Sequence, residues 1–201
     1  MKLPQGANRL LVLAMVAFAF AYYVDTRGPA RAPGVLAPND PTLTPVAAGA
    51  PSYEKLGYRI VPLAAIALEA RVLGVQRYYT GRQADLSPLD VVFGWGPLSD
   101  SAVLATIDTA QDRREYFWTQ YANAPTKRDI ERHSANMHLI PADESIERTL
   151  KKLRPGHVVK LSGYVVEVYA GDGWKWAGPA LGGDAAPGSG QPVWVNKAEM
   201  R

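Results

Sequence analysis

Two histidines and an asparagine lie close together in the stretch HSANMHLIP, residues 133–141. His133 and His138 are candidate general bases, because an imidazole gains or loses a proton near neutral pH. Asn136 stands between them as a candidate hydrogen-bond donor. The same three side chains also suit a structural role, in which they satisfy backbone groups of a buried, irregular segment. We favour the structural role and keep the catalytic one as the alternative.

The spacing of the histidines argues against a metal site. They are five residues apart, which places them on opposite faces of a strand or about 140° apart around a helix. A zinc site usually takes at least three protein ligands. Only Asp143 or Glu144 follows closely enough to complete one. The sequence therefore predicts neither a metal nor a cofactor.

Helix signals flank this stretch on both sides. Thr126, with Asp129 three residues later, predicts a capped short helix that ends near His133. A second helix is predicted to begin at Asp143 and to stop at residues 155–156, with acidic residues first and basic residues last, as the helix dipole favours. HSANMHLIP is then expected to form the crossing between two helices.

Four further residues are candidates for ligand binding. Trp174 and Trp176 follow a predicted Gly-Asp-Gly turn and share one face of a strand. Paired tryptophans stack on a sugar or a base, or they close the end of a barrel, which we favour here. Asp172 in the turn and Trp118 in an aromatic strand complete the set, although core packing is the simpler explanation of Trp118.

Strand patterns occur before and after the helices. Apolar and charged residues alternate over residues 66–72, and the alternation slips at residues 73–74, which predicts a bulge in a long bent strand. Residues 157–169 read as strand around a second bulge at Gly163. Residues 192–196 are predicted to form a closing strand at a sheet edge.

Two more helix starts are predicted. Ser87 with Pro88 and Asp90 has the pattern of an N-cap, a first-turn proline and an acid. Ser99 is expected to cap another short helix. Together these signals predict an α+β fold: a small, strongly bent antiparallel sheet or a partly open, OB- or SH3-like barrel with short helices, behind an N-terminal transmembrane helix.

The N-terminus predicts export from the cytoplasm. Residues 10–24 carry no charge and follow Lys2 and Arg9. This run suits either a cleaved signal peptide or, with Tyr22 and Tyr23 at the headgroup level, a retained signal anchor, which we favour. The expected organisation is a signal-anchor helix over residues 1–25, a linker over 26–52 and a folded domain over 53–201.

The linker is rich in proline, alanine and glycine. Such a composition does not form a core of its own and favours an extended spacer of up to about 80 Å. The domain is then expected in the periplasm, tethered to the bacterial inner membrane by a single span with a cytoplasmic N-terminus. Cleavage of the signal would instead leave a soluble periplasmic protein.

Composition limits the function further. The 201 residues have a net charge of +3 and no cysteine, which excludes disulfides and a thiolate nucleophile and gives no reason to expect a nucleic-acid partner. Converging acid, base and nucleophile residues are scarce. We therefore expect a membrane-tethered, non-enzymatic binding or assembly module of the envelope, with an envelope protein or glycan as partner. The alternative is a periplasmic hydrolase of wall glycan or phosphodiesters with His133 or His138 as base.

Several strings resemble an uncharacterised family of small membrane-anchored bacterial proteins: GVLAP (34–38), GWGPLSD (94–100), HSANMHLIPA (133–142), and LRPG followed by VKLSGYVVEV and DGWKW. The resemblance covers most of the folded part and implies no activity, so no catalytic residue follows from it. Members tend to end in a Gly-Ala-Cys-Glu-like sequence. Here that place holds the sequence SGQPVW, residues 189–194, so any role of the cysteine is missing from this chain.

Overall fold

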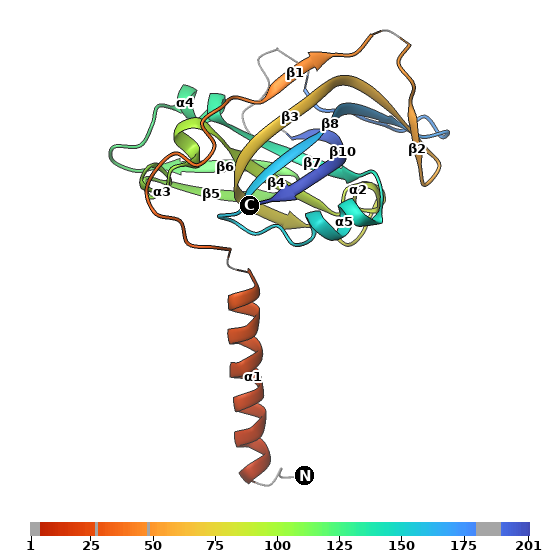
Figure 1. The fold of residues 1–201 in the computed structure, drawn as a ribbon. Helices are drawn as coiled ribbons and strands as arrows, with labels where there is room; N and C mark the ends of the chain where they lie inside the picture. The colour runs from red at the N-terminus through yellow and green to blue at the C-terminus, as the bar shows by residue number, and fades with distance from the viewer. Residues whose placement is uncertain (1–4, 27, 48, 180–189) are drawn as a thin grey trace.

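The computed structural model describes residues 5–26, 28–47, 49–179 and 190–201 of the chain (Figure 1). The helical elements are α1 (Gln5–Thr26), α2 (Arg82–Leu86), the 3-10 turn η1 (Gly96–Ser99), α3 (Ser101–Leu104), α4 (Lys127–His133) and α5 (Glu144–Leu150). The strands are β1 (Thr42–Pro45), β2 (Tyr53–Lys55), β3 (Tyr58–Arg77), β4 (Leu89–Gly94), β5 (Ile107–Asp112), β6 (Glu115–Gln120), β7 (Ser134–Pro141), β8 (Val158–Tyr169), β9 (Lys175–Trp176) and β10 (Gln191–Met200). The fold is α+β, as predicted, and strands dominate it.

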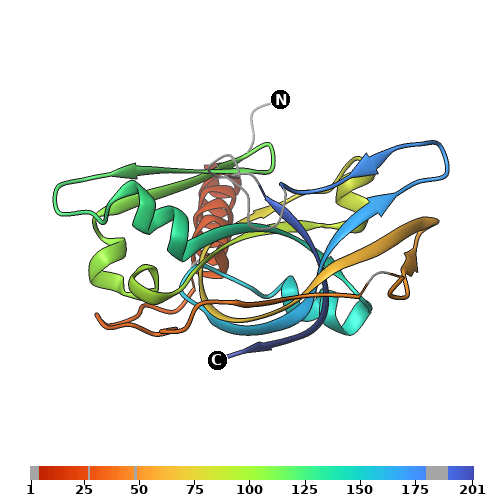
Figure 2. The ribbon, with the colours of Figure 1, turned by 90° about the horizontal axis from the view of Figure 1, so that it is seen from above.

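The strand pairing returns to its starting point. The long β3 pairs with β8 through residues 59–71 and with β4 through residues 71–77. From β4 the pairing continues to β7, then in parallel to β10, and then antiparallel to β8. The five strands β3, β4, β7, β10 and β8 therefore curve around a shared interior (Figure 2).

Alternate side chains of these strands fill that interior. Leu89, Val91 and Phe93 of β4 pack there with Met137 and Leu139 of β7. Successive side chains of a strand point to opposite faces. The residues between them, at positions 90, 136 and 138, consequently point to the outer face of the same strands.

Several local predictions are confirmed. The register of β3 against β4 shifts between Val72 and Gly74, at the predicted bulge. Thr126 and Asp129 form a reciprocal capping box at the start of α4. Asp143 caps α5 by accepting hydrogen bonds from two backbone N–H groups. Each of these features depends on residues within one turn or one strand.

HSANMHLIP is not a crossing between helices. His133 is the last residue of α4, and residues 134–141 form β7, which pairs with β4 on one side and β10 on the other. The N-cap prediction at Ser87 is also wrong, because α2 ends at Leu86 and β4 begins at Leu89. The Ser87 hydroxyl donates to the carbonyl oxygen of Leu89 at 3.2 Å instead. In both places, burial of alternate apolar residues inside the ring outweighs the local helix and turn signals.

Two further predictions are corrected at the closing strand and at Ser99. β10 does not lie at a sheet edge; it lies between β7 and β8. The irregularity expected at Gly163 appears opposite it, between Val195 and Lys197 of β10. Asp100, not Ser99, caps α3 by accepting from the backbone N–H of Ala102.

The proline-rich segment is not a free spacer. Residues 42–45 form β1, which pairs with β3. Just before it, the Ser99 hydroxyl accepts from the backbone N–H groups of Leu36 and Ala37 at 3.0 and 3.1 Å, and Ala37 is fully buried. The Gly34 N–H donates to Asp100 at 2.9 Å. The strings GVLAP and GWGPLSD thus bind each other, and the segment lies along the domain.

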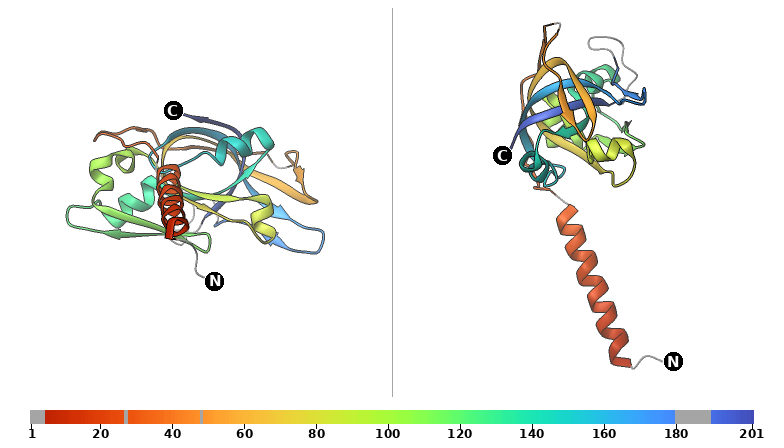
Figure 3. Two further views of the ribbon diagram at one scale, coloured as in Figure 1. Left: turned by 90° about the horizontal axis from the view of Figure 1, so that it is seen from below. Right: turned by 90° about the vertical axis from the view of Figure 1, so that its right-hand side faces the viewer.

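Helix α1 stands apart from the strands, and the chain enters the domain beside the loop after α5 (Figures 1 and 3). Its apolar side chains from Leu10 to Phe18 are exposed, Leu10 by 70% and Phe18 by 74%. Among the residues described, no helix is both long and apolar enough to cross a membrane.

Candidate functional site

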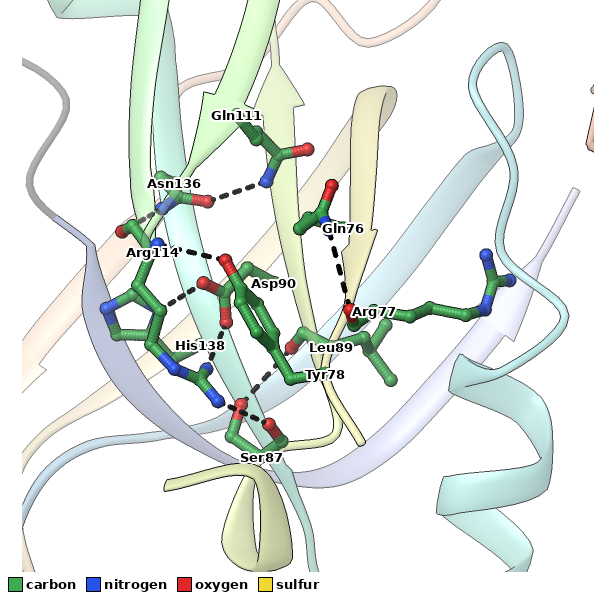
Figure 4. A network of polar contacts seen from close by, with 10 residues as sticks. All are labelled: Gln76, Arg77, Tyr78, Ser87, Leu89, Asp90, Gln111, Arg114, Asn136 and His138. Carbon is green, nitrogen blue, oxygen red and sulfur yellow. Dashed lines mark hydrogen bonds and ion pairs between the residues drawn. The ribbon is translucent and has the colours of Figure 1, made fainter. Parts of the chain in front are cut away.

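A buried carboxylate lies at the centre of a polar network on the outer face of β4 and β7 (Figure 4). Asp90 is fully buried, and its Oδ1 accepts from Arg114 Nη1 at 2.6 Å. Its Oδ2 lies 3.0 Å from Nδ1 of His138, although the angles of this contact are not those of a hydrogen bond. Cross-strand pairing of positions 90 and 138 brings these two side chains together.

Asn136 extends the network to the β5–β6 hairpin. Its amide nitrogen donates to the carbonyl oxygen of Arg114 at 2.9 Å, and its amide oxygen accepts from Gln111 at 3.2 Å. Only 2% of Asn136 and 4% of His138 are exposed. The amide therefore fastens the hairpin over the outer face of β7.

The hairpin turn consists of two arginines in an unfavourable backbone conformation. Arg113 and Arg114 have φ values of 48° and 67° and join Asp112 of β5 to Glu115 of β6. A two-residue turn with two positive φ values normally takes Asn-Gly, and a left-handed residue other than glycine costs about 1–2 kcal/mol. Strain of this kind persists only where surrounding contacts hold it.

Arg114 supplies those contacts. Its backbone N–H donates to the Tyr78 hydroxyl at 2.9 Å, and its Nη2 donates to the Ser87 carbonyl oxygen at 3.0 Å. The guanidinium carbon lies 4.0 Å from the centre of the Tyr78 ring. Burial, followed by the charge of Asp90, raises the pKa of the Tyr78 hydroxyl. The turn therefore directs Arg114 inward and leaves Arg113 outside, 91% exposed.

Two further groups close the network from the side. The Trp176 ring lies 5.2 Å from the imidazole of His138, centre to centre, and is 7% exposed. The backbone at Gly190 passes so close that a Cβ there would collide with the imidazole and lie 3.0 Å from Nδ2 of Asn136. His138 is consequently enclosed by the Trp176 ring, the Asp90 carboxylate and the backbone of Gly190.

A cleft of about 530 Å³ opens above this network. Its walls come from the β3–β4 connection at residues 78–84, from the Arg113–Arg114 turn, and from Trp174. Tyr78 and Trp174 give it aromatic surface, and Arg113 gives it an exposed positive charge. A cleft with these walls suits a ligand that carries both a flat apolar face and an anionic group.

Asp172 fixes one wall of the cleft. It accepts from both terminal nitrogens of Arg82, at 2.6 and 3.3 Å, and from the backbone N–H of Trp174 at 3.1 Å. The hydrogen bond from Arg82, then that from the backbone, lowers the pKa of the Asp172 carboxyl. The Arg82 guanidinium lies 5.1 Å from the Trp174 ring centre. Asp172 therefore positions the arginine and the tryptophan together.

The predicted site residues fall into separate places. His133 ends α4, its Nδ1 lies 2.8 Å from the Asp129 carbonyl oxygen, and its ring packs against Gly96. Trp118 packs with Tyr116 and the small core around Ile130. Trp174 lines the cleft, Asp172 supports it through Arg82 and the Trp174 backbone, and Trp176 lies against Trp174 and His138. The two histidines do not share a site.

Sequence reasoning missed Asp90, Arg114 and the cleft residues Tyr78, Arg82 and Arg113. The sequence predicts a helix start that includes Asp90, and the Arg113–Arg114 pair lacks the usual turn residues. The one signal for a turn is the aromatic run YFW (116–118) that follows it, because the residues before it, IDTAQD (107–112), form no apolar run. Within the described ranges, no group of three or more His, Asp or Glu side chains is placed to hold a metal ion.

A second pocket, of about 330 Å³, lies beside β1. Four of its charged residues pair with one another, Lys160 with Glu69 at 3.8 Å and Lys197 with Glu199 at 3.1 Å, and Asp40 lies beside them. Unlike the cleft, it has no aromatic residue among the described residues of its walls. No protein-family model, curated protein or solved structure matches this chain.

Proposed function

We propose that the protein is a membrane-anchored, periplasmic binding module of the bacterial envelope, and that its cleft binds an anionic glycan. The observation that carries the proposal is that the buried polar cluster and the open cleft consist of largely different side chains. The Asp90–Arg114–His138 cluster is enclosed and serves to hold the hairpin, while the open cleft above it presents aromatic and cationic groups. This arrangement suits binding more than catalysis.

The strand order supports an OB-type barrel as the scaffold. In chain order, the first strand of the ring pairs with the second and the fourth, the third pairs in parallel with the fifth, and α5 lies between the third and fourth. OB barrels bind oligosaccharides and oligonucleotides on the face of strands two and three and with the 1–2 and 4–5 loops. The cleft is lined by the corresponding connections, through residues 78–84 and Trp174. This part of the argument is an analogy of fold.

The ligand class follows from the side chains. Tyr78 and Trp174 provide flat faces for a sugar ring, and Arg113 provides a charged donor for a carboxylate or phosphate. Arg82 is already paired with Asp172, so it shapes the wall more than it adds charge. A glycan with acidic groups satisfies both requirements at once.

The exposed apolar surface of α1 supports a retained inner-membrane anchor with the domain in the periplasm. An isolated helix whose leucines and phenylalanine face solvent needs an apolar environment. The preceding Lys2 and Arg9 favour a cytoplasmic N-terminus. Cleavage of this segment as a signal peptide is the alternative. The resemblance to a family of small membrane-anchored bacterial proteins is a further reason for the anchor.

A hydrolase is the second candidate, because Asp90 beside Nδ1 of His138 is an arrangement that orients a general base. The enclosure of His138 counts against it, since a base must reach its substrate. We expect the full chain in detergent to co-sediment with purified peptidoglycan sacculi without releasing soluble glycan.

The same experiment separates the candidates. Arg113→Gln and Trp174→Ala should each weaken sedimentation about tenfold, the size of one charge-assisted or stacking contact. Arg128→Gln, on the exposed surface of α4, is the control and should sediment like the parent. Failure of the parent to sediment, or equal sedimentation of all variants, would refute the proposed function. Glycan release that His138→Gln abolishes would establish the hydrolase instead.

A further inference from the structure

Basic side chains gather where the chain leaves α1 and enters the domain. We call this group the anchor-side basic surface; it consists of Arg31, Lys151, Lys152, Arg154 and Arg201. They come from the segment after α1, from the loop after α5, and from the residue that follows β10. Figure 3 shows the loop after α5 and the C-terminus on the side of the domain nearest α1.

Direct contacts join this surface to the end of α1. A Cβ on Gly28 would collide with the Pro155 carbonyl oxygen and lie 3.0 Å from Cβ of Arg154. Gly28 is two residues beyond Thr26, the last residue of α1, so the Cα atoms of Arg154 and Thr26 are at most about 13 Å apart. That limit is between one and two Debye lengths at physiological ionic strength.

Arg31 fixes the geometry. Its Nε donates to the carbonyl oxygen of Gly156 and its Nη2 to the carbonyl oxygen of Arg201, both at 3.0 Å. These bonds hold the first residues of the domain against the loop after α5 and against Arg201, the residue that follows β10. The basic surface therefore keeps its position relative to the chain that enters from α1.

Like charges in one place destabilise a fold unless an anion compensates them. Two carboxylates supply part of the compensation: Glu147 lies 2.5 Å from Nζ of Lys151, and Glu69 pairs with Arg201. Among the described residues, no side-chain carboxylate pairs with two other exposed or half-buried cations of the surface, Arg31 and Lys152. The effect of the surface on a neighbour is visible at His157, whose pKa is lowered by burial and then by the charges of Arg31 and Arg154.

We propose that the anchor-side basic surface binds the anionic phospholipid headgroups of the leaflet from which α1 emerges, and so holds the domain in one orientation on the membrane. This inference rests on the anchor in the proposed function, and it is independent of what the cleft binds. Each Lys or Arg near an anionic surface strengthens binding about fivefold, which corresponds to about 1 kcal/mol. Removal of two charges should therefore weaken headgroup contact by about 25-fold.

The test uses the full chain in lipid nanodiscs that contain a headgroup quencher. Because the protein has no cysteine, a single Ser145→Cys substitution on the exposed start of α5 accepts one fluorescent label. Quenching is compared between phosphatidylcholine discs and discs with about 30% phosphatidylglycerol, a composition that gives a negative surface. Lys151→Gln/Lys152→Gln is the test variant, and Arg128→Gln/Arg132→Gln on α4 removes the same charge elsewhere.

We expect stronger quenching in the anionic discs, lost in the Lys151/Lys152 variant and at high salt, and retained in the α4 control. Equal quenching in both lipids, or retention by the Lys151/Lys152 variant, overturns the inference. Failure of the protein to co-elute with discs would refute the anchor itself, which is a different result from incorporation without lipid dependence. Sacculus binding reports on the cleft and is unaffected by either outcome.

Discussion

Arg114→Met tests whether the buried carboxylate depends on the hairpin. The substitution keeps an unbranched apolar stem but removes the guanidinium that donates to Asp90 at 2.6 Å and to the Ser87 carbonyl oxygen at 3.0 Å. Asp90 has no exposed surface, and Arg114 is 12% exposed. The variant therefore leaves a carboxylate in a place that water does not reach, beside a histidine without good hydrogen-bond geometry.

Breaking a buried ion pair by removing one partner costs about 3–5 kcal/mol of unfolding free energy. Removal of both charges costs less, because no uncompensated charge stays buried. We therefore expect Arg114→Met to lose about 3–5 kcal/mol and Asp90→Asn/Arg114→Met to lose less than the two single variants added together. A coupling of about 1–3 kcal/mol is typical for side chains in direct contact.

Urea unfolding of the full chain in mild detergent, followed by tryptophan fluorescence, measures these losses. Arg113→Met is the matched control, because Arg113 also has a positive φ but its side chain is 91% exposed. Its ion pair with Asp112, at 3.7 Å, is exposed to solvent as well. This control should change stability by no more than about 0.5 kcal/mol. The reasoning fails if Arg114→Met behaves like this control, or if the losses of the Asp90 and Arg114 variants simply add.

Three further outcomes are expected, each measured against the parent protein. Gly163→Ala should cost about 3 kcal/mol in urea unfolding, because its Cβ would collide with the Trp194 carbonyl oxygen; a loss below about 1 kcal/mol contradicts that close approach. Ser99→Ala removes the acceptor of two backbone N–H groups, so residues 28–47 should be cleaved faster in limited proteolysis, and an unchanged rate argues against docking of the segment. His157 has a folded-state pKa below its ordinary 6.5, so the unfolded chain binds the proton more readily and stability should fall as pH drops below about 6.5. His157→Gln should lose less stability over that range in thermal melts, and an identical pH profile would contradict the assignment.

The sequence predicts features that depend on near neighbours. The capping box of Thr126 and Asp129 and the N-cap at Asp143 involve residues within one helical turn. The bulge near Gly74 changes the face that side chains occupy, so it leaves a visible slip in the apolar alternation. Each of these signals is complete within the segment that carries it, and each is found in the structure.

The role of HSANMHLIP depends on distant parts of the chain. On β7, Met137 and Leu139 face the interior, which leaves Asn136 and His138 on an outer face. Polar residues there read as exposed or as loop, because nothing nearby in sequence shows that Arg114 and Gly190 cover them. Parallel pairing with β10 comes from residues more than 50 positions away, and periodicity does not report it.

The linker and the hairpin turn also depend on contacts with distant residues, which the local sequence does not show. The proline-rich composition predicts an extended spacer, and it contains no information about the hydroxyl of Ser99 or the edge of β3 with which the segment pairs. At the hairpin, local preference predicts against two arginines with positive φ. Tertiary contacts to Tyr78, Asp90 and Asn136 override that preference.

The two arginines of the turn therefore have different roles. One stabilises the hairpin, and the other presents its charge at the cleft. Arg114 bonds through its backbone and its side chain to the outer face of β4 and β7, so replacing it affects the whole hairpin. Arg113 is held in place by those same bonds yet makes only a loose contact with Asp112. A related protein could therefore change residue 113 and the residue at position 174 to bind a different ligand, provided that the buried Asp90–Arg114 pair below is kept. Under the proposed function, ligand specificity would depend on Arg113 and stability on Arg114, two neighbouring residues of a single turn.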